Sequence, residues 1–174
     1  MTRFRQLNVG WNAEPNAPDP RVMVDGRDVV VSFRTNPYQF SEFTSEDVGK
    51  LRFHSCSRYR LGSTNDEGWY LGQCRFSKIA PSWGEFYEVS GDLRLAKCPA
   101  DWVEISAPSG ILRHFLFYFR DNTLECDAAD WSLEVWRPNT ALEPAAVGPG
   151  TSAFAGEVTF RRGLVPHVKP HRRP

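Results

Sequence analysis

The sequence predicts an all-β fold, mostly an antiparallel sandwich or barrel, with one or two short helical turns. Three observations predict it: apolar residues alternate with polar ones in many short runs, turn formers separate these runs, and no long segment has helical periodicity. The chain has 174 residues, of which 41% are hydrophobic and 13% aromatic. A single core of that composition has enough apolar surface to offset the conformational entropy lost on folding.

The first predicted element is a β-hairpin over residues 21–34. Two valine-rich runs meet at an Asp-Gly pair, residues 25–26, where glycine takes the positive φ that a tight turn needs. In the second run Val29, Val31 and Phe33 share one face and polar residues share the other. We therefore expect one buried face and one solvated face.

Further strands are predicted from the same two-residue period and from aromatic enrichment. They cover residues 51–55, 69–76, 85–89, 102–105, 111–120 and 131–136. In the segment 111–120, Phe115, Phe117 and Phe119 share one face and Leu116 lies on the other. This segment is expected to be a central strand of the core.

Helical and turn signals are short. Residues 40–48, with Ser45 as an N-cap, and residues 126–130 are each expected to form a helical turn. The acidic run 121–127 resembles a calcium loop in composition only, because Cys126 and Ser132 occupy the positions where such a loop has glycine and glutamate. A surface turn is the favoured interpretation there.

The sequence predicts a single β domain over residues 1–137, followed by a Pro/Gly-rich linker and basic tail over residues 138–174. This tail has five Lys and Arg against two Asp and Glu. Residues 154–161 regain strand character, and the sequence leaves open whether they dock on the sheet as one extra strand.

Charge and composition limit the expected partners and location. Lys and Arg together number 21, as do Asp and Glu, so the formal net charge is zero and a nucleic-acid partner is not expected. The chain lacks the apolar run of a signal peptide or a membrane span, which predicts a cytoplasmic protein without a membrane partner. The oligomeric state is left open.

No cofactor or metal site is predicted. The four cysteines are widely spaced, with no Cys-x-x-Cys pair and no histidine at zinc-ligand spacing, so they are interpreted as reduced thiols. They are Cys56, Cys74, Cys98 and Cys126.

One group of side chains is predicted to bind a ligand, because aromatic rings beside hydrogen-bonding groups suit sugars, bases or a partner's side chains. Its members are Arg58, Arg60, Asp66, Trp69, Tyr70, Trp83 and Glu85. The competing interpretation is that these are ordinary turn and strand residues. A related pattern, in which Arg52, His54, Cys56, Arg58 and Arg60 alternate along one unbroken strand, is better interpreted as a solvated face.

The predicted function is a small cytoplasmic binding or interaction domain for a polar small molecule or a partner protein. The alternative is an enzyme that acts on a polar substrate in a barrel mouth or on a sandwich face. In that alternative His54 or His114 is the general base and Glu85 is a carboxylate partner. No nucleophile elbow, P-loop or dinucleotide fingerprint is present, so catalytic residues stay unassigned.

Overall fold

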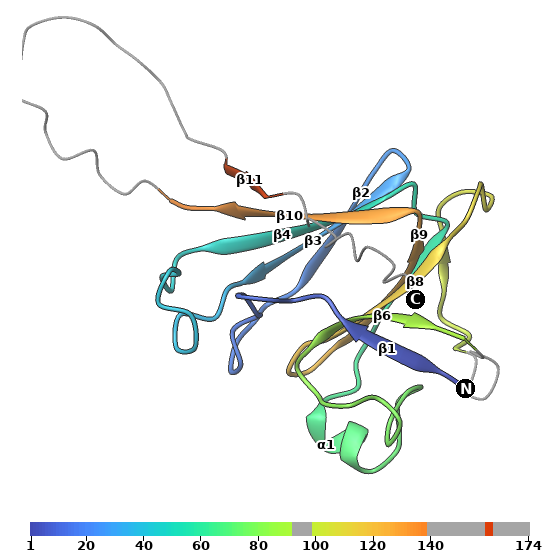
Figure 1. Ribbon diagram of the computed structural model, residues 1–174, viewed down its shortest axis with the longest axis horizontal. Helices are drawn as coiled ribbons and strands as arrows, with labels where there is room; N and C mark the ends of the chain where they lie inside the picture. The colour runs from blue at the N-terminus through green and yellow to red at the C-terminus, as the bar shows by residue number, and fades with distance from the viewer. Residues whose placement is uncertain (92–98, 139–158, 162–174) are drawn as a thin grey trace, which may run out of the picture.

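The computed structural model consists of two antiparallel β-sheets packed face to face (Figure 1). It describes residues 1–91, 99–138 and 159–161. The six-stranded sheet has the order β1-β6-β8-β9-β5-β7 and the five-stranded sheet the order β11-β10-β4-β3-β2. The all-β prediction is confirmed, and the presence of two separate sheets selects the sandwich from the two expected architectures.

Consecutive strands mostly share a sheet: after β1 the chain builds β2 to β4 in one sheet and β5 to β9 in the other, and β10 and β11 return to the first. In the six-stranded sheet they are β1 (Arg3–Gln6), β5 (Arg58–Gly62), β6 (Phe86–Ser90), β7 (Val103–Glu104), β8 (Arg113–Tyr118) and β9 (Thr123–Ala128). In the five-stranded sheet they are β2 (Arg21–Asp25), β3 (Asp28–Arg34), β4 (Val48–His54), β10 (Asp130–Trp136) and β11 (Thr159–Arg161).

The predicted hairpin is confirmed. β2 and β3 pair antiparallel with Asp25 opposite Asp28, and Gly26 in the turn has a φ of 62°. Val29, Val31 and Phe33 are buried against the other sheet, as their spacing predicts.

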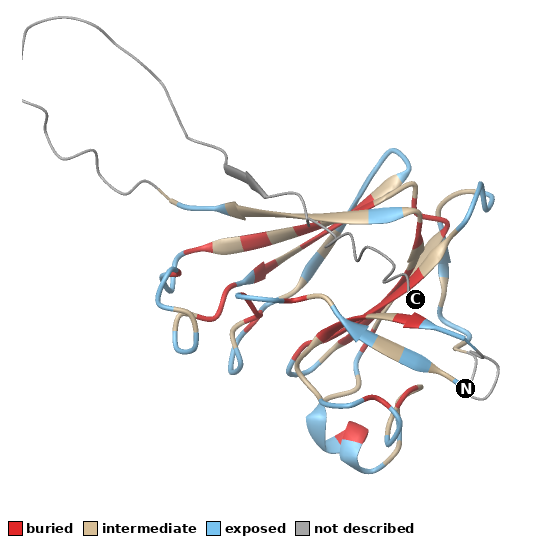
Figure 2. Ribbon diagram, viewed as in Figure 1, coloured by how far each residue is buried: buried red, intermediate tan, exposed pale blue. Residues whose placement is uncertain are grey.

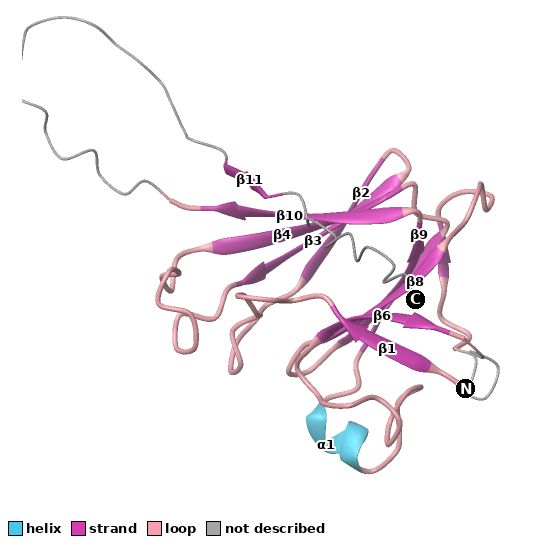
Figure 3. Ribbon diagram, in the orientation of Figure 1, coloured by secondary structure: helices cyan, strands magenta, loops and turns pink. Residues whose placement is uncertain are grey.

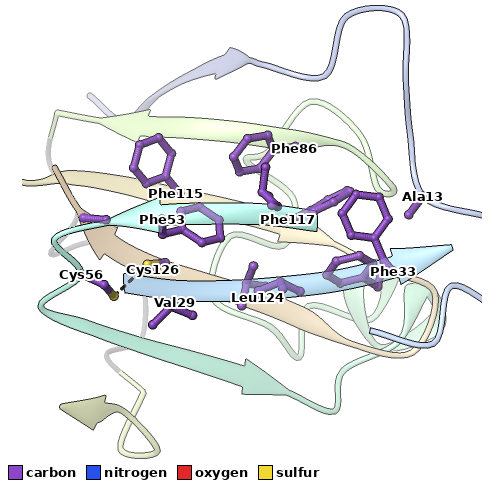
Figure 4. Packing of buried hydrophobic residues seen from close by; sticks show 14 of the residues in the cluster. Ala13, Val29, Phe33, Phe53, Cys56, Phe86, Phe115, Phe117, Leu124 and Cys126 are labelled. Carbon is purple, nitrogen blue, oxygen red and sulfur yellow. Dashed lines mark hydrogen bonds between the residues drawn. The ribbon is translucent and has the colours of Figure 1, made fainter. Parts of the chain in front are cut away.

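The core between the sheets is built mainly from phenylalanines (Figure 4). The ring centroids of Phe33 and Phe117 lie 5.5 Å apart, as do those of Phe53 and Phe115. Figure 2 shows that buried residues occur along strands of both sheets. β8 lies between β6 and β9, so the prediction of a central strand around Phe117 is confirmed.

One pair of chain segments runs through both sheets as a bent antiparallel ribbon. β4 pairs with β10, and the continuation of each segment, β5 and β9, pairs in the other sheet. At the bend residues 55–57 face residues 128–129, so one segment has an extra residue, as in a β-bulge. Ser55 has a φ of 49° there, and its N–H donates to Oδ1 of Asp28 at 3.0 Å.

This bend overturns three expectations. The alternation from Arg52 to Arg60 is not one strand, because the chain changes sheets at residues 55–57 and buries Cys56 in the core. The expected surface turn at 121–127 and helical turn at 126–130 are wrong, since β9 occupies this stretch. Leu124 and Cys126 face the core, whereas Glu125 and Asp127 lie on the opposite face.

Two other local predictions are also wrong. Residues 69–76 do not form a strand: they include the end of a short helix, α1 (Asp66–Tyr70), and a series of turns (Figure 3). The side chain of Asn65 caps α1 by accepting from the N–H of Gly68 at 2.9 Å. No helix begins at Ser45; Asp47 instead accepts hydrogen bonds from the backbone and hydroxyl of Thr44.

The C-terminal part of the chain contributes one described strand. β11 pairs antiparallel with β10 and lies inside the range 154–161 where a docked strand was considered. The residues around it, 139–158 and 162–174, lie outside the described residues, as does Cys98. In the described part of the chain, no helix has the length and the apolar composition needed to cross a membrane.

Candidate functional site

The outer face of the six-stranded sheet, on the side away from the five-stranded sheet, is overlaid by residues 63–85, here called the covering segment (Figure 1). Its buried residues Trp69, Phe76 and Ala80 pack against a second apolar cluster on the sheet. The sheet residues of that cluster are Tyr87, Val89, Leu116 and Tyr118. The sheet is therefore buried on both faces here, which explains why β8 is apolar on both sides.

Three predicted site residues meet in an aromatic group on this segment. Trp83 stacks on Tyr118 with ring centroids 4.6 Å apart, and Trp69 contacts both rings at 6.2 Å. Tyr70 packs edge-on against Trp69 at 5.0 Å. Burial raises the pKa of Tyr118, so this phenol stays neutral. Trp69 is buried among these rings, so it is a core residue that supports Tyr70.

The outward side of the covering segment exposes three large apolar side chains among polar ones such as Asp66 and Lys78. Tyr70 is 68% exposed, Leu71 65% and Ile79 50%. These three residues are here called the apolar contact residues. They are large side chains in solvent on a segment whose other side is fixed by buried rings, an arrangement typical of binding surfaces.

The predicted residues Arg58 and Arg60 lie apart from the aromatic group, in a cluster of charges on β5 and its neighbours. Arg58 donates from Nε to Asp127 at 2.6 Å, and its guanidinium lies 4.3 Å from the centre of the Trp102 ring. Arg60 donates to Asp101 at 2.8 and 3.0 Å, and to Glu125 at 2.9 Å. Both arginines are thus engaged by carboxylates of the chain itself.

Glu125, a fully buried carboxylate, is at the centre of this charge cluster. It accepts from Arg60 and Arg75 at 2.9 Å each, and Nε2 of His114 lies 3.0 Å from its Oε2. Burial alone would raise the pKa of Glu125, but His114, Arg75 and Arg60 together hold it below the usual value. Because Arg75 belongs to the covering segment, this carboxylate also ties that segment to the sheet.

His114 lies between two carboxylates. Its Nδ1 is 2.6 Å from Oδ1 of Asp127, and its Nε2 contacts Glu125. Burial would lower the pKa of His114, yet the bonds to Asp127 and Glu125 outweigh burial and raise it. Both ring nitrogens are engaged by carboxylates of the chain, so neither is directed at a substrate proton, and the geometry argues against a role of His114 as a general base.

The two remaining predicted residues have local partners. Asp66 lies in the first turn of α1 and accepts from the N–H of Glu67 at 2.8 Å. Glu85 accepts from the side-chain amides of Gln6 at 2.9 Å and Asn8 at 2.5 Å, which fixes the N-terminal segment to the start of β6. The seven predicted residues therefore divide between the covering segment, the charge cluster and this N-terminal contact.

A cleft of about 480 Å³ opens at one end of β6 and β8. Its described lining comprises Glu88, Val89, Ser90, Gly91, Ile111, Leu112, Arg113, His114 and Asp127. None of the seven predicted residues belongs to this lining. The polar groups of the cleft are already bonded to one another, for example Arg113 to Glu88 at 2.8 Å.

The other histidine of the alternative prediction, His54, lies on the outer face of the five-stranded sheet. Its Nδ1 is 3.3 Å from Oδ2 of Asp28, and its Nε2 is 2.9 Å from Oγ of Ser132. Burial raises the pKa of Asp28, but the N–H of Ser55, Arg52 and His54 together lower it below the usual value. Asp28, His54 and Ser132 come from three adjacent strands, β3, β4 and β10.

Sequence reasoning missed several of these residues. Asp28 and Ser132 had no local signal, because only the strand order β10-β4-β3 brings them to His54. Glu125 and Asp127 did have one: they alternate with Leu124 and Cys126 with the two-residue period of a strand.

Comparison with known proteins assigns neither a family nor a function to the chain. The chain matches no protein-family model, no curated protein and no solved structure. Within residues 1–91, 99–138 and 159–161, no group of three or more His, Cys, Asp or Glu side chains is arranged to hold a metal ion.

Proposed function

We propose that this chain is an interaction domain that binds a partner protein through its covering segment. The observation that carries the proposal is the concentration of Tyr70, Leu71 and Ile79, all at least half exposed, on one segment anchored from beneath by buried aromatic rings. Exposed aromatic and aliphatic side chains on a rigid base are the usual energetic centre of a protein interface.

Rigidity of the base favours binding, because less conformational entropy is lost when a preformed surface meets its partner. The stacked Trp83 and Tyr118, the Asn65 cap and the bond from Arg75 to Glu125 each restrict the covering segment. Tyr70 is held edge-on against Trp69 before any partner arrives.

A small polar ligand is less well supported at the predicted site. Arg58 and Arg60 already bind carboxylates of the chain, and a ligand would have to displace Asp127, Glu125 or Asp101 from them. The described cleft lies elsewhere, and none of the predicted residues lines it. Partner-protein binding therefore fits the geometry better than small-molecule binding.

The test is to identify a partner by affinity capture from source cells and then measure its affinity for purified variants. Tyr70→Ala is expected to weaken binding at least roughly tenfold, about 1.4 kcal/mol, as for an interface anchor. Tyr38→Ala is the matched control, since Tyr38 is a similarly exposed tyrosine in the loop between β3 and β4. Equal affinities of wild type, Tyr70→Ala and a Leu71→Ala/Ile79→Ala double variant would contradict the proposal.

A second candidate function is hydrolysis of an ester at Ser132, and the Asp28–His54–Ser132 hydrogen-bond chain favours it. A serine hydroxyl becomes nucleophilic when an adjacent imidazole takes its proton, and a carboxylate behind the imidazole orients that ring. Ser132 Oγ would attack the ester carbonyl while its proton moves to Nε2 of His54. The proton then goes to the leaving alcohol as the C–O bond breaks, and water releases the acyl group. The His54 side chain is 40% exposed, so a substrate can reach the ring.

The test of this candidate uses an activated aryl ester and a fluorophosphonate label. We expect Ser132→Ala to abolish both hydrolysis and labelling, and His54→Ala to lower them. Ser32→Ala is the control, because Ser32 lies on β3 in the same sheet and pairs opposite Lys50. Equal labelling of wild type and Ser132→Ala would exclude the candidate.

A further inference from the structure

Two cysteines meet inside the core at the bend of the ribbon. The Sγ atoms of Cys56 and Cys126 lie 3.2 Å apart, and both residues are fully buried (Figure 4). Cys56 belongs to the bulge between β4 and β5, and Cys126 belongs to β9. Both are free thiols, and Cys56 Sγ also lies 3.3 Å from the backbone oxygen of Arg58.

We propose that Cys56 and Cys126 form an intramolecular disulfide when the chain folds under oxidising conditions. A disulfide has its sulfur atoms about 2 Å apart, so these two need to approach by only about 1 Å. Cys126 lies on β9, which pairs with β5 directly after the bulge that holds Cys56, so the backbone pairing of the ribbon keeps the two residues close together. The inference is independent of the proposed partner binding.

The bond would link residues 70 positions apart in the chain. A cross-link that closes so long a loop removes many conformations from the unfolded chain, which raises the stability of the folded state. It would also join the bulge to β9, at the place where the chain passes from one sheet to the other.

The chemistry is a thiol–disulfide exchange with glutathione disulfide as the oxidant. One cysteine thiolate attacks the glutathione disulfide, which forms a mixed disulfide and releases one glutathione. The second cysteine thiolate then attacks the mixed disulfide and releases the other glutathione. The two cysteine sulfurs lose two electrons, the oxidant gains them, and the two thiol protons pass to the two glutathione molecules.

Burial determines when this exchange takes place. Neither thiol is accessible in the folded chain, and burial raises the pKa of Cys126, so little thiolate forms there. Oxidation therefore takes place while the chain folds, or when the folded chain opens transiently. Once formed, the bond is protected from external reductants for the same reason.

The experiment refolds the reduced, full-length chain from denaturant in a glutathione redox buffer and, in parallel, in excess dithiothreitol. Intact mass after alkylation and a peptide map without reduction identify the linked cysteines. We expect a loss of two hydrogen atoms, a peptide pair joining Cys56 to Cys126, and an unfolding temperature higher than that of the reduced chain by about 5–15 °C.

Matched variants separate this pair from the other thiols. A Cys74→Ser/Cys98→Ser double variant is expected to form the bond as the wild type does, and Cys126→Ala is expected to lose it. The proposal is overturned if both Cys56 and Cys126 are alkylated after oxidative refolding, if either links to another cysteine, or if the oxidised chain melts below the reduced one. The peptide map of the wild type decides the question even where a variant fails to fold.

Discussion

His114 donates a hydrogen bond from Nδ1 to Oδ1 of Asp127 across 2.6 Å, on the buried outer face of the six-stranded sheet. Its other nitrogen faces the fully buried Glu125, and against the effect of burial the hydrogen bonds to these two carboxylates raise the pKa of His114 and so favour the protonated ring. A protonated histidine inside the protein makes the charge cluster sensitive to pH.

The first prediction concerns this pH dependence. The pKa of His114 is raised above its ordinary 6.5, so its contribution to stability is complete below pH 6.5 and is lost as the pH rises through the folded-state pKa. The pKa values of Glu125 and Asp127 are lowered, so their contributions are lost only as the pH falls through their folded-state values. We expect the free energy of unfolding in urea to fall above pH 6.5 in the wild type, and less so in His114→Gln. Parallel curves for the two chains would contradict this.

The second prediction tests the centre of the charge cluster. Glu125→Gln removes the charge that compensates Arg60, Arg75 and His114 in a buried place, and this is expected to cost about 3–5 kcal/mol of unfolding free energy. Asp101→Asn is the control, because the Asp101 side chain is itself 56% exposed although it also pairs with Arg60, and its loss should cost less than about 1 kcal/mol. Denaturant unfolding measures both losses of free energy. Equal losses would show that the buried position of Glu125 does not increase the cost of removing its charge.

The third prediction concerns the core between the sheets. Phe117→Ala is expected to lower the unfolding free energy by about 3–5 kcal/mol, because the ring is fully buried between Phe33, Phe86 and Phe119. Thermal and urea unfolding measure the loss. An unchanged melting midpoint would remove Phe117 from the core.

The fourth prediction distinguishes the buried Trp69 from the exposed Tyr70 on the covering segment. Trp69→Ala is expected to destabilise the fold by about 3–5 kcal/mol, because Trp69 packs under the segment against Trp83 and Tyr118. Tyr70→Ala should change the unfolding free energy by less than about 1 kcal/mol, since its ring is mostly in solvent. If both substitutions unfold the protein alike, Tyr70 is a core residue and cannot serve as a contact residue.

The sequence predicted those strands whose faces differ in polarity and whose turns have a local signal. The hairpin of β2 and β3 combines both, with Val29, Val31 and Phe33 on the buried side and Gly26 in the turn. The segment around Trp69 was predicted as a strand because aromatic residues are also common in strands. The helix forms there because Asn65 caps its N-terminus and Trp69 is buried against the sheet.

The candidate site was less predictable than the fold. Trp69, Tyr70 and Trp83 are close in sequence, so their proximity was foreseeable, and the structure brings them together. The pairing of Arg58 with Asp127 and of Arg60 with Glu125 was not, because it depends on the register of β5 against β9, more than sixty residues away. Such pairings have no signature in a single sequence.

The bent ribbon has a consequence for how the chain folds. Its two halves, β4 paired with β10 and β5 paired with β9, belong to different sheets, yet both form only when residues 48–62 pair with residues 123–136. The sandwich therefore has a high contact order, which slows the search for the native topology. Because one long-range encounter nucleates both layers, their amide protons should exchange with solvent as a single cooperative unit.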